Sequence, residues 1–261
     1  MSLAAVSVTQ LGKRYSVNEM RFQGTLTDAV GRWARTVFGR KPKDPLAKRD
    51  IPSAIWALRG ASFEVETGKI LGIIGRNGSG KSTLLRILAR ITTPTEGNAV
   101  LRGRVGALLE VGTGFHPDLS GRENILLSGT MIGMTPREIR KREEEIVEFS
   151  ECADFIDTPV RHYSSGMFMR LAFAVAAHLE AEIMLVDEVL AVGDEAFQNK
   201  CKAKIRETAL NGRTVLFTSH DMDAIRKICS SCMVLDYGRP LHVGDVDEAI
   251  KLYHDVCSRQ S

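Results

Sequence analysis

The segment GRNGSGKST, residues 75–83, constrains the fold of this chain more than any other feature. It matches the pattern GxxxxGK[ST], follows the apolar run ILGII and precedes a sequence that favours a helix. Glycines in such a loop let backbone N–H groups surround a phosphate. Lys81 adds a positive charge at the β- and γ-phosphates, and the Ser82 hydroxyl is an oxygen ligand of the kind that Mg²⁺ prefers. The segment therefore predicts a P-loop, with phosphate contacts from Gly75, Arg76, Asn77, Gly78, Ser79, Gly80, Lys81, Ser82 and Thr83.

Strand-forming and helix-forming segments alternate along the chain, which favours an α/β fold with a mostly parallel sheet. The run KILGIIG is apolar enough to be a strand that is buried on both faces. A helix is predicted at TPREIRKREEEIVEF, because Thr135 and Glu138 form a capping box and Pro136 suits the first helical position. Further strands are expected at LAAVSVTQLGKRY, ASFEVE, EGNAVLRGRVGALLE, EIMLVDE and TVLFTSH.

Composition narrows the class of protein. A chain of 261 residues with 44% hydrophobic and 26% charged residues suits a soluble domain with a full core. A net charge of +3 is too slight to argue for a nucleic acid partner. The run LAFAVAAHL is shorter than the roughly 20 residues of a membrane-spanning helix. The start, MSLAAVSVTQ, lacks the features of a signal peptide, so a cytoplasmic location is expected.

Two further segments carry groups suited to hydrolysis. Asp187 and Glu188 follow the apolar strand IMLV. In a P-loop protein an Asp at this place holds Mg²⁺, and a second carboxylate beside it is placed to act as a base for the attacking water. His220 ends the strand TVLFTSH, at a sheet edge where ligands of α/β proteins bind. There it would donate a hydrogen bond to a γ-phosphate and orient the water.

The segment RHYSSGMFMR, residues 161–170, predicts a second site for an anion. Ser164 and Ser165 are candidates to cap a helix, and Gly166 allows close backbone approach. The free N–H groups and the dipole of a helix N-terminus attract phosphate. One chain thus contains two phosphate-binding sequences, although its P-loop already supplies a complete one.

In their order, these motifs resemble the nucleotide-binding domain of ABC transporters. The P-loop is followed by YSSGM at 163–167, VDE at 186–188, GD at 193–194 and His220. The family signature is usually LSGGQ, so Ser164 and Gly166 match it, whereas Tyr163, Ser165 and Met167 depart. The resemblance covers residues 1–250, with a parallel core sheet, an antiparallel β subdomain and a helical subdomain at about 115–180.

This resemblance implies ATP and Mg²⁺ as ligands and a head-to-tail dimer of two copies. Each ATP would lie between the P-loop of one copy and the signature of the other, which explains the second phosphate-binding sequence. The residues that act on the partner's ATP would be Ser164, Ser165, Gly166 and Met167, Asp194 would belong to the D-loop, and Ser82 and Asp187 would bind the metal.

Residues 107–124, ALLEVGTGFHPDLSGREN, narrow the resemblance. Glu110 stands where the family usually has the Gln of its Q-loop, and an ionised carboxylate cannot donate a hydrogen bond as Gln does. Together with YSSGM and LAVGD, this segment resembles ATPase subunits that export lipid-linked polysaccharides such as O-antigen, capsule or teichoic acid. A permease subunit in the cytoplasmic membrane, with this chain peripheral on its cytoplasmic face, is implied. A drug or lipid exporter is the alternative.

Two other classes of P-loop protein are alternative interpretations of this sequence. Soluble ABC proteins that act on ribosomes or DNA usually carry two such domains or a long coiled coil between P-loop and signature, and neither feature occurs in the sequence. A P-loop kinase or GTPase would have no role for YSSGM and His220. Some polysaccharide exporters carry a C-terminal carbohydrate-binding domain, and residues 251–261 are expected to form only a short tail.

Several residues have two interpretations. Tyr15 in GKRY is a candidate to stack on adenine, and Trp56 is its competitor. Cys229 and Cys232 form a CxxC that suits redox or metal chemistry, but no second pair stands at zinc spacing, which favours two small buried residues near a strand.

Residues 16–55 form an insertion where a short hairpin is usual in the family. A helix is expected after Thr27, with Val30, Trp33, Val37 and Phe38 largely on one side. It is either a solvated element of its own domain or a contact with the permease, the lipid or its phosphate. The basic residues that favour a phosphate contact are Arg32, Arg35, Arg40, Lys41, Lys43, Lys48 and Arg49.

Overall fold

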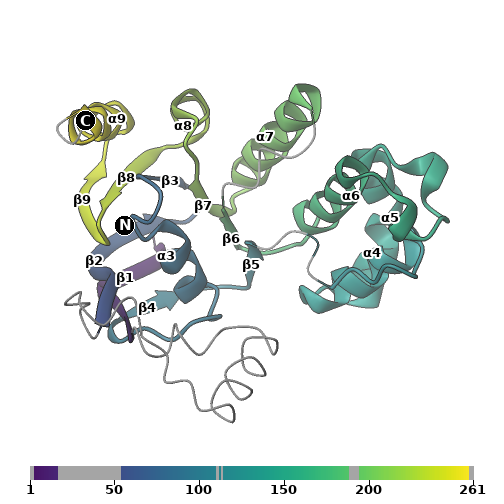
Figure 1. Cartoon of the computed structure of the whole chain (residues 1–261), viewed down its shortest axis with the longest axis horizontal. Helices are drawn as coiled ribbons and strands as arrows, with labels where there is room; N and C mark the ends of the chain where they lie inside the picture. The colour runs from purple at the N-terminus through teal and green to yellow at the C-terminus, as the bar shows by residue number, and fades with distance from the viewer. Residues whose placement is uncertain (1–2, 17–53, 110–111, 113, 188–193, 259–261) are drawn as a thin grey trace, which may run out of the picture.

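The computed structural model describes residues 3–16, 54–109, 112, 114–187 and 194–258 (Figure 1). Two β-sheets with α3, α8 and α9 form one end of the molecule, and α4, α5 and α6 form the other. The helix α7 lies between these two groups in Figure 1. Most of the predicted insertion, including the helix expected after Thr27, lies outside the described residues.

The larger sheet has six strands in the order β5-β6-β7-β3-β8-β9. All neighbours in it are parallel except β8 and β9. Its inner strands are short apolar runs because both faces of the sheet are covered. The predicted mostly parallel sheet is thereby confirmed. The strands are β3 (Ile70–Ile74), β5 (Val105–Leu108), β6 (Ile183–Val186), β7 (Thr214–Thr218), β8 (Ser231–Asp236) and β9 (Arg239–Gly244).

The smaller sheet is the antiparallel part of the fold. Its order is β2-β1-β4, with β1 (Ala4–Ser16) between β2 (Ala54–Glu66) and β4 (Glu96–Leu101). The run EGNAVLRGRVGALLE therefore divides between two sheets, because the chain turns at Gly103, whose φ of 130° suits glycine.

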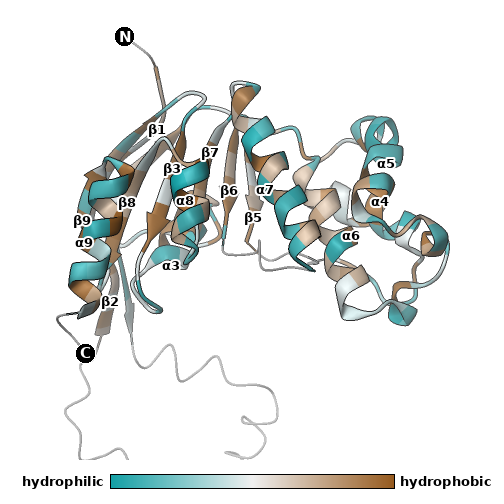
Figure 2. Cartoon of the chain, turned by 90° about the horizontal axis from the view of Figure 1, so that it is seen from above, coloured by the Kyte–Doolittle hydropathy of each residue, from teal (hydrophilic) through white to brown (hydrophobic). Residues whose placement is uncertain are grey.

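Alternate residues of the parallel strands enter two separate cores, one on each face of the larger sheet. Leu71 and Ile73 of β3 pack with α3 (Lys81–Leu88) and with the antiparallel sheet. Ile70 and Ile74 face the opposite core. The helices α7 (Glu195–Leu210), α8 (Met222–Ile228) and α9 (Val246–Ser258) contribute to this second core, and Figure 2 shows all three on the same side of the strands.

The helical subdomain contains α4 (Gly121–Met131), α5 (Pro136–Ser150) and α6 (Ser165–Ala177). Short 3₁₀ turns at Ala153–Phe155 and Val160–His162 connect α5 to α6.

The predicted capping box of α5 is present. The Thr135 side chain accepts from the Glu138 backbone N–H at 3.2 Å, and the Thr135 N–H donates to the Glu138 carboxylate at 2.5 Å. The bond from the Thr135 backbone N–H, with help from Arg104, holds the pKa of Glu138 at about 2.

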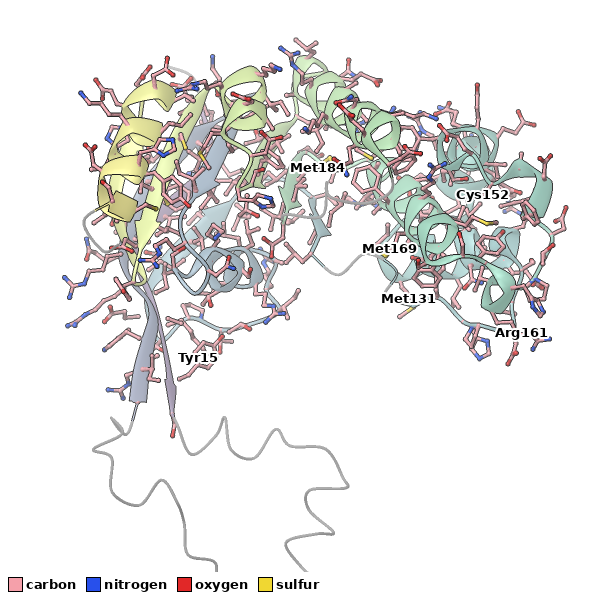
Figure 3. All side chains as sticks on the ribbon, turned by 45° about the horizontal axis from the view of Figure 1, so that its top comes forward. Tyr15, Met131, Cys152, Arg161, Met169 and Met184 are labelled. Atoms are coloured by element: carbon pink, nitrogen blue, oxygen red, sulfur yellow. The ribbon has the colours of Figure 1, made fainter. Side chains whose placement is uncertain are left out.

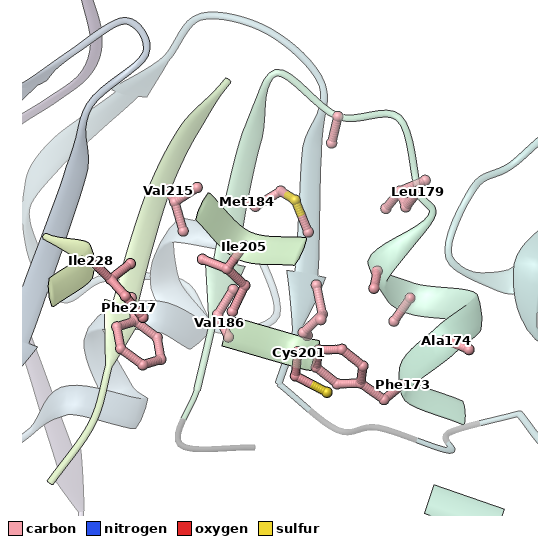
Figure 4. Close-up of a cluster of buried hydrophobic side chains, with 14 of the residues drawn as sticks. Phe173, Ala174, Leu179, Met184, Val186, Cys201, Ile205, Val215, Phe217 and Ile228 are labelled. Carbon is pink, nitrogen blue, oxygen red and sulfur yellow. The ribbon is translucent and has the colours of Figure 1, made fainter. Parts of the chain in front are cut away.

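An aromatic cluster joins the helical subdomain to α7. The rings of Phe149, Phe173 and Phe197 have centroids 5.7–6.3 Å apart. Figure 4 shows how Phe173 lies beside Cys201 of α7, with Val186 and Met184 of β6 and Val215 and Phe217 of β7 in the same core. Because Phe149 and Phe173 belong to α5 and α6, this one cluster connects three elements.

Two sequence expectations concern the C-terminal third. The expected tail at 251–261 is partly helix, since α9 continues without a break to Ser258. Cys229 and Cys232 are free thiols, and Cys232 is buried on β8, as the structural interpretation of the CxxC predicted. Burial raises the pKa of Cys232 to about 12, which leaves its thiol protonated and unreactive.

Among the helices of the described segments, none has the length and apolar character that crossing a bilayer requires.

We predict that Phe197→Ala destabilises the protein by about 3–5 kcal/mol, because it leaves a cavity where α7 meets the helical subdomain. Leu210→Ala on the same helix is the control, since Leu210 is 87% exposed and its truncation should change stability by less than about 0.5 kcal/mol. Denaturant unfolding of both variants measures the difference. Equal stability of the two variants would contradict the prediction.

Candidate nucleotide-binding site

The predicted P-loop connects β3 to α3, and its backbone has the form of an anion cradle. The helix begins at Lys81 after Gly80, whose φ is 104°. A Cβ on Gly80 would collide with the carbonyl oxygen of Ala57, so only glycine fits there. Gly78 also has a positive φ, 79°, and open space around it. The first N–H groups of α3 therefore point out of a loop that a phosphate can approach closely.

Lys81 is only 8% exposed, although it carries a charge. Its ammonium group donates to the carbonyl oxygens of Gly75 at 2.7 Å and Arg76 at 3.1 Å. The side chain is thus folded back over the loop, where its charge faces the cradle. The buried hydroxyl of Ser79 has no hydrogen-bond partner in the described structure. Because an unsatisfied buried hydroxyl is costly, Ser79 is a further group that a bound oxyanion would satisfy.

Two other predicted residues come to the same edge of the sheet. The strands β6, β7 and β3 are parallel neighbours, so their carboxyl ends lie together. Asp187 follows β6, and its carboxylate accepts a hydrogen bond of 2.6 Å from the Thr218 hydroxyl at the end of β7. His220 stands two residues further along and lines a cavity with Lys81. Asp187, His220 and the P-loop therefore all lie at the carboxyl edge of the larger sheet.

The donors at this edge suit Mg²⁺ bound together with phosphate. The Ser82 hydroxyl is exposed, and Asp187 supplies a half-buried carboxylate. Both are hard oxygen donors, of the kind that Mg²⁺ takes along with phosphate oxygens. Within the described residues no three His, Cys, Asp or Glu side chains cluster tightly enough to hold a metal alone.

Two cavities flank the P-loop. One, of about 380 Å³, has on its surface Ala57, Asn77, Gly78, Ser79, Gly80, Lys81, Ser82 and Thr83. The other, of about 360 Å³, has on its surface Gly75, Arg76, Asn77, Lys81, His220, Tyr253 and Cys257. The first lies against the antiparallel sheet, and the second lies against His220 and α9.

The two candidate aromatic residues lie on opposite faces of the β1–β2 ribbon. Tyr15 pairs with Ile55, and the Lys13 ammonium lies 5.1 Å from its ring. Trp56 pairs with Arg14, whose guanidinium lies 5.8 Å from the indole, while that of Arg59 lies 5.1 Å from it.

Ala57, two residues after Ile55 on β2, lines the cavity beside the P-loop. The pairing of β1 with β2 shifts between Lys13–Leu58 and Arg14–Trp56, so Ala57 is the extra residue of a bulge and does not continue the alternation from Ile55. The ribbon geometry therefore does not choose between Tyr15 and Trp56, and Tyr15 stays the predicted adenine contact.

The signature segment begins α6. Ser164 is the N-cap, and its hydroxyl accepts from the Met167 backbone N–H at 3.1 Å. Ser164 and Ser165 are exposed, so this helix end is open to a ligand. Tyr163, where the family has Leu, donates its hydroxyl to the Phe155 carbonyl at 2.7 Å and packs against Gly121. Burial raises the pKa of Tyr163 to about 12, so the Tyr anchors the turn rather than serving as an acid.

The signature does not meet the P-loop of its own chain. Figure 1 places α6 in the helical subdomain, at the opposite end of the molecule from α3. The side-chain view in Figure 3 shows the same separation, with Met169 and Arg161 on one side and Tyr15 on the other. The structure therefore contains the two predicted phosphate-binding elements but does not bring them together within one chain.

Two predicted residues, Glu110 and Glu188, lie outside the described residues. The segment after Glu110 packs on the signature helix, because the rings of Phe115 and Phe168 meet edge to face at 5.0 Å. The buried amide of Asn124 shapes that segment by donating to the carbonyl oxygens of His116, Leu119 and Ser120. Asn124 was not predicted, although its place in the helix-start sequence SGREN marks a segment with defined turn chemistry.

The sequence also did not predict the role of Arg170. Its guanidinium donates to Asp194 at 2.6 Å and to Glu151 at 2.8 Å, so it ties α6 to the start of α7. Asp194, the predicted D-loop residue, caps α7 by accepting from the Phe197 N–H at 2.9 Å. That bond, aided by Arg170, lowers the pKa of Asp194 and keeps it ionised. Such a long-range ion pair leaves no periodic signal in a sequence.

Comparison with known proteins agrees with this geometry. The sequence matches the family model described as ABC transporter over residues 58–191. Solved structures with the same fold include an ATP-binding cassette, MJ0796, in a dimer bound to ADP and Pi, with a TM-score of 0.68, 21% identity and coverage of 92% of this chain and 98% of that one. An ATP binding subunit of an ABC transporter has a TM-score of 0.70 and 18% identity, covering 96% and 93% of the two chains.

Curated relatives are more similar in sequence. The O-antigen export system ATP-binding protein RfbB of Myxococcus xanthus is 49% identical over 206 residues, or 79% of this chain and 47% of that protein. RfbB of Klebsiella pneumoniae is 47% identical over 197 residues, or 76% of this chain and 80% of that protein. The teichoic acids export ATP-binding protein TagH of Bacillus cereus is 39% identical over 213 residues. These residues are 82% of this chain and 39% of that protein.

The chain thus spans about half the length of the Myxococcus relative and most of the Klebsiella relative. The names of these relatives agree with the polysaccharide-export subgroup that residues 107–124 resemble. Since the family model covers about half of the 261 residues and the fold agrees throughout, this chain belongs to the ABC transporter family.

Proposed function

We propose that this chain is the ATP-hydrolysing subunit that drives export of a lipid-linked cell-surface polysaccharide, such as an O-antigen, through a separate transmembrane permease. It acts as a dimer at the cytoplasmic face of the membrane, as a peripheral subunit. The observation that carries the proposal is the convergence of the P-loop, Asp187 and His220 at one sheet edge, in a chain whose signature helix stands apart. The similarity to O-antigen and teichoic acid export proteins supports the choice of cargo.

ATP binds with its phosphates in the cradle formed by residues 75–83. The N–H groups at the start of α3 and the Lys81 ammonium contact the β- and γ-phosphates, which replace the carbonyl partners that Lys81 now has. Ser82 and Asp187 would hold Mg²⁺, which would supply positive charge at the β- and γ-phosphates. Tyr15 stacks on the adenine, as the resemblance to the family implies.

Hydrolysis depends on two side chains at the γ-phosphate. Glu188 accepts the proton of the attacking water, because it follows Asp187 at the end of β6. His220 donates a hydrogen bond to the γ-phosphate and fixes its position relative to that water. The Thr218 hydroxyl donates to Asp187 and holds its carboxylate in place. In this proposal Asp187 binds the metal and Glu188 acts as the base.

The signature completes the site of the other copy. The exposed N-terminus of α6, with Ser164, Ser165, Gly166 and Met167, presents N–H groups and a positive dipole end to the partner's γ-phosphate. Asp194 and Arg170 connect this helix to α7, which follows the segment that contains Glu188. Through that connection, the position of the signature at the partner's ATP would be coupled to the position of Glu188 at the ATP of its own chain.

We predict that Glu188→Gln keeps ATP binding and lowers the hydrolysis rate by about 10²–10⁴-fold, because the base is lost while Asp187 remains. The assays are ATP turnover and ATP-driven export of a lipid-linked glycan by proteoliposomes that contain the copurified permease. Glu195→Gln, which neutralises an exposed carboxylate of α7, is the control and should match the wild type. Normal turnover by Glu188→Gln would contradict the catalytic assignment. If the wild-type protein hydrolysed ATP but drove no export, only the transport assignment would be contradicted.

We predict that mixing Lys81→Ala chains with Ser164→Arg chains restores part of the ATPase activity that each variant lacks alone. In the mixed dimer both defects fall in one shared site, and the second site is intact. A mixture of Lys81→Ala with Glu188→Gln is the matched control, because both residues serve the ATP bound by their own chain and every site stays damaged. Recovery in both mixtures, or in neither, would contradict the shared site.

We predict that Arg170→Ala reduces ATP turnover with little change in ATP affinity, because the signature helix loses its link to Asp194. Residues that couple two elements typically change such coupling by about 0.5–2 kcal/mol. Arg161→Ala is the control, since its ion pair with Asp118 is exposed and of little energetic value. Steady-state kinetics measure the loss of turnover, and equilibrium ATP binding measures any loss of affinity. A loss of affinity equal to the loss of turnover would argue against the linking role.

A further inference from the structure

The C-terminal helix α9 reaches the P-loop. The cavity of about 360 Å³ beside His220 is lined on one side by Gly75, Arg76 and Asn77. On the other side it is lined by Tyr253 and Cys257 of α9. No motif in the sequence connects α9 with the nucleotide, and the proposed ATP chemistry does not use either residue.

The position of α9 is fixed by its packing. Ala249 and Ile250 are buried in the core beneath the helix. The helix contacts β3, β8, β9 and α8, and Figure 2 shows it along the outer strands of the larger sheet. The Asp247 carboxylate also accepts from Arg226 of α8 at 2.9 Å. A helix held on so many sides can serve as a rigid support.

Tyr253 and Cys257 lie one helical turn apart, so they share one face of α9. Tyr253 is half-buried and packs against the core. Its hydroxyl interacts with the Cys257 thiol. The side chain lines the same cavity as Arg76 of the P-loop. The next residue, His254, is exposed. The face of α9 that turns toward the P-loop is therefore different from the face that turns to water.

The first part of the P-loop needs such a support. Residues 75–77 follow the end of β3 and precede the first turn of α3, so they have neither strand nor helix hydrogen bonding of their own. Arg76 and Asn77 are exposed. Ordering a loop costs conformational entropy, which neighbouring rigid elements can reduce in advance.

We propose that Tyr253 is a positioning residue for the P-loop, in that its ring holds residues 75–77 in the arrangement that receives the phosphates of ATP. The inference rests on the proposed ATP function and adds a part to that site. Cys257 lines the same cavity, so the accessibility of its thiol is a measure of how the loop is arranged there. When ATP orders the loop, access to the Cys257 thiol decreases, and when Tyr253 is truncated, the loop loses its support.

The first experiment compares Tyr253→Ala, Tyr253→Phe and Lys251→Ala in the full chain by equilibrium binding of ATP, ATP turnover and thermal unfolding. Tyr253→Ala should raise the Kd for ATP about 3- to 100-fold, a range that corresponds to the coupling energies between neighbouring groups. Tyr253→Phe keeps the ring and should restore most of the affinity. Lys251→Ala, at an exposed position of the same helix, should match the wild type in all three assays.

The second experiment uses the unaltered sequence, so it does not depend on how a variant folds. Cys257 is one of two cysteines that are not fully buried, and peptide mass spectrometry separates its labelling from that of Cys229. The rate at which a maleimide labels Cys257 should fall several-fold when ATP is added. In Lys81→Ala, ATP should give no protection.

The outcomes separate the two proposals. Wild-type protein that binds no ATP would overturn the proposed function and this inference together. ATP binding by the wild type, with an unchanged Kd in Tyr253→Ala, would overturn the positioning role alone. Labelling of Cys257 that ATP leaves unchanged would also overturn it. A raised Kd that Phe restores, at an unchanged melting temperature, supports the role of the Tyr253 ring.

Discussion

Burial of both faces of the parallel sheet is the constraint on which the rest of this structure depends. Because β6, β7 and β3 are apolar on both sides, each must lie between two cores, and their parallel register brings their carboxyl ends to one edge. Asp187 and His220 are thereby placed beside the P-loop although they are far from it in sequence. A shift of one residue in any of these strands would exchange the two cores, so the same packing that stabilises the sheet also fixes the geometry of the site.

The helical subdomain is positioned by a different and smaller set of contacts. The cluster of Phe149, Phe173 and Phe197 and the ion pairs of Arg170 attach it to α7, not to the P-loop. The signature helix is therefore attached to α7 and not to the loop before α3. This arrangement agrees with the proposal that the site needs two copies, because the signature lies apart from the P-loop of its own chain.

The parts that were predicted correctly are those with a local signal. The P-loop, the capping box of Thr135 and the apolar runs of β3, β6 and β7 each carry their information within a few residues. Parts that depend on distant partners were not predicted. The division of β4 and β5 between two sheets, the bonds of Arg170 and the cavity that Tyr253 shares with Arg76 all involve segments far apart in the chain.

The sequence by itself determined the chemistry of this protein: a phosphate cradle, an Asp–Glu pair after one strand, a His after another and a helix start with two serines. These motifs can be recognised in the sequence because each needs glycine, lysine or carboxylate residues at fixed spacing along one short stretch of chain. Only the tertiary structure decided which of these groups meet. It put Tyr15 and Trp56 on opposite faces of one ribbon, separated the signature from the P-loop and brought α9 to the loop, since these relations follow from how strands pair and helices pack across long sequence distances.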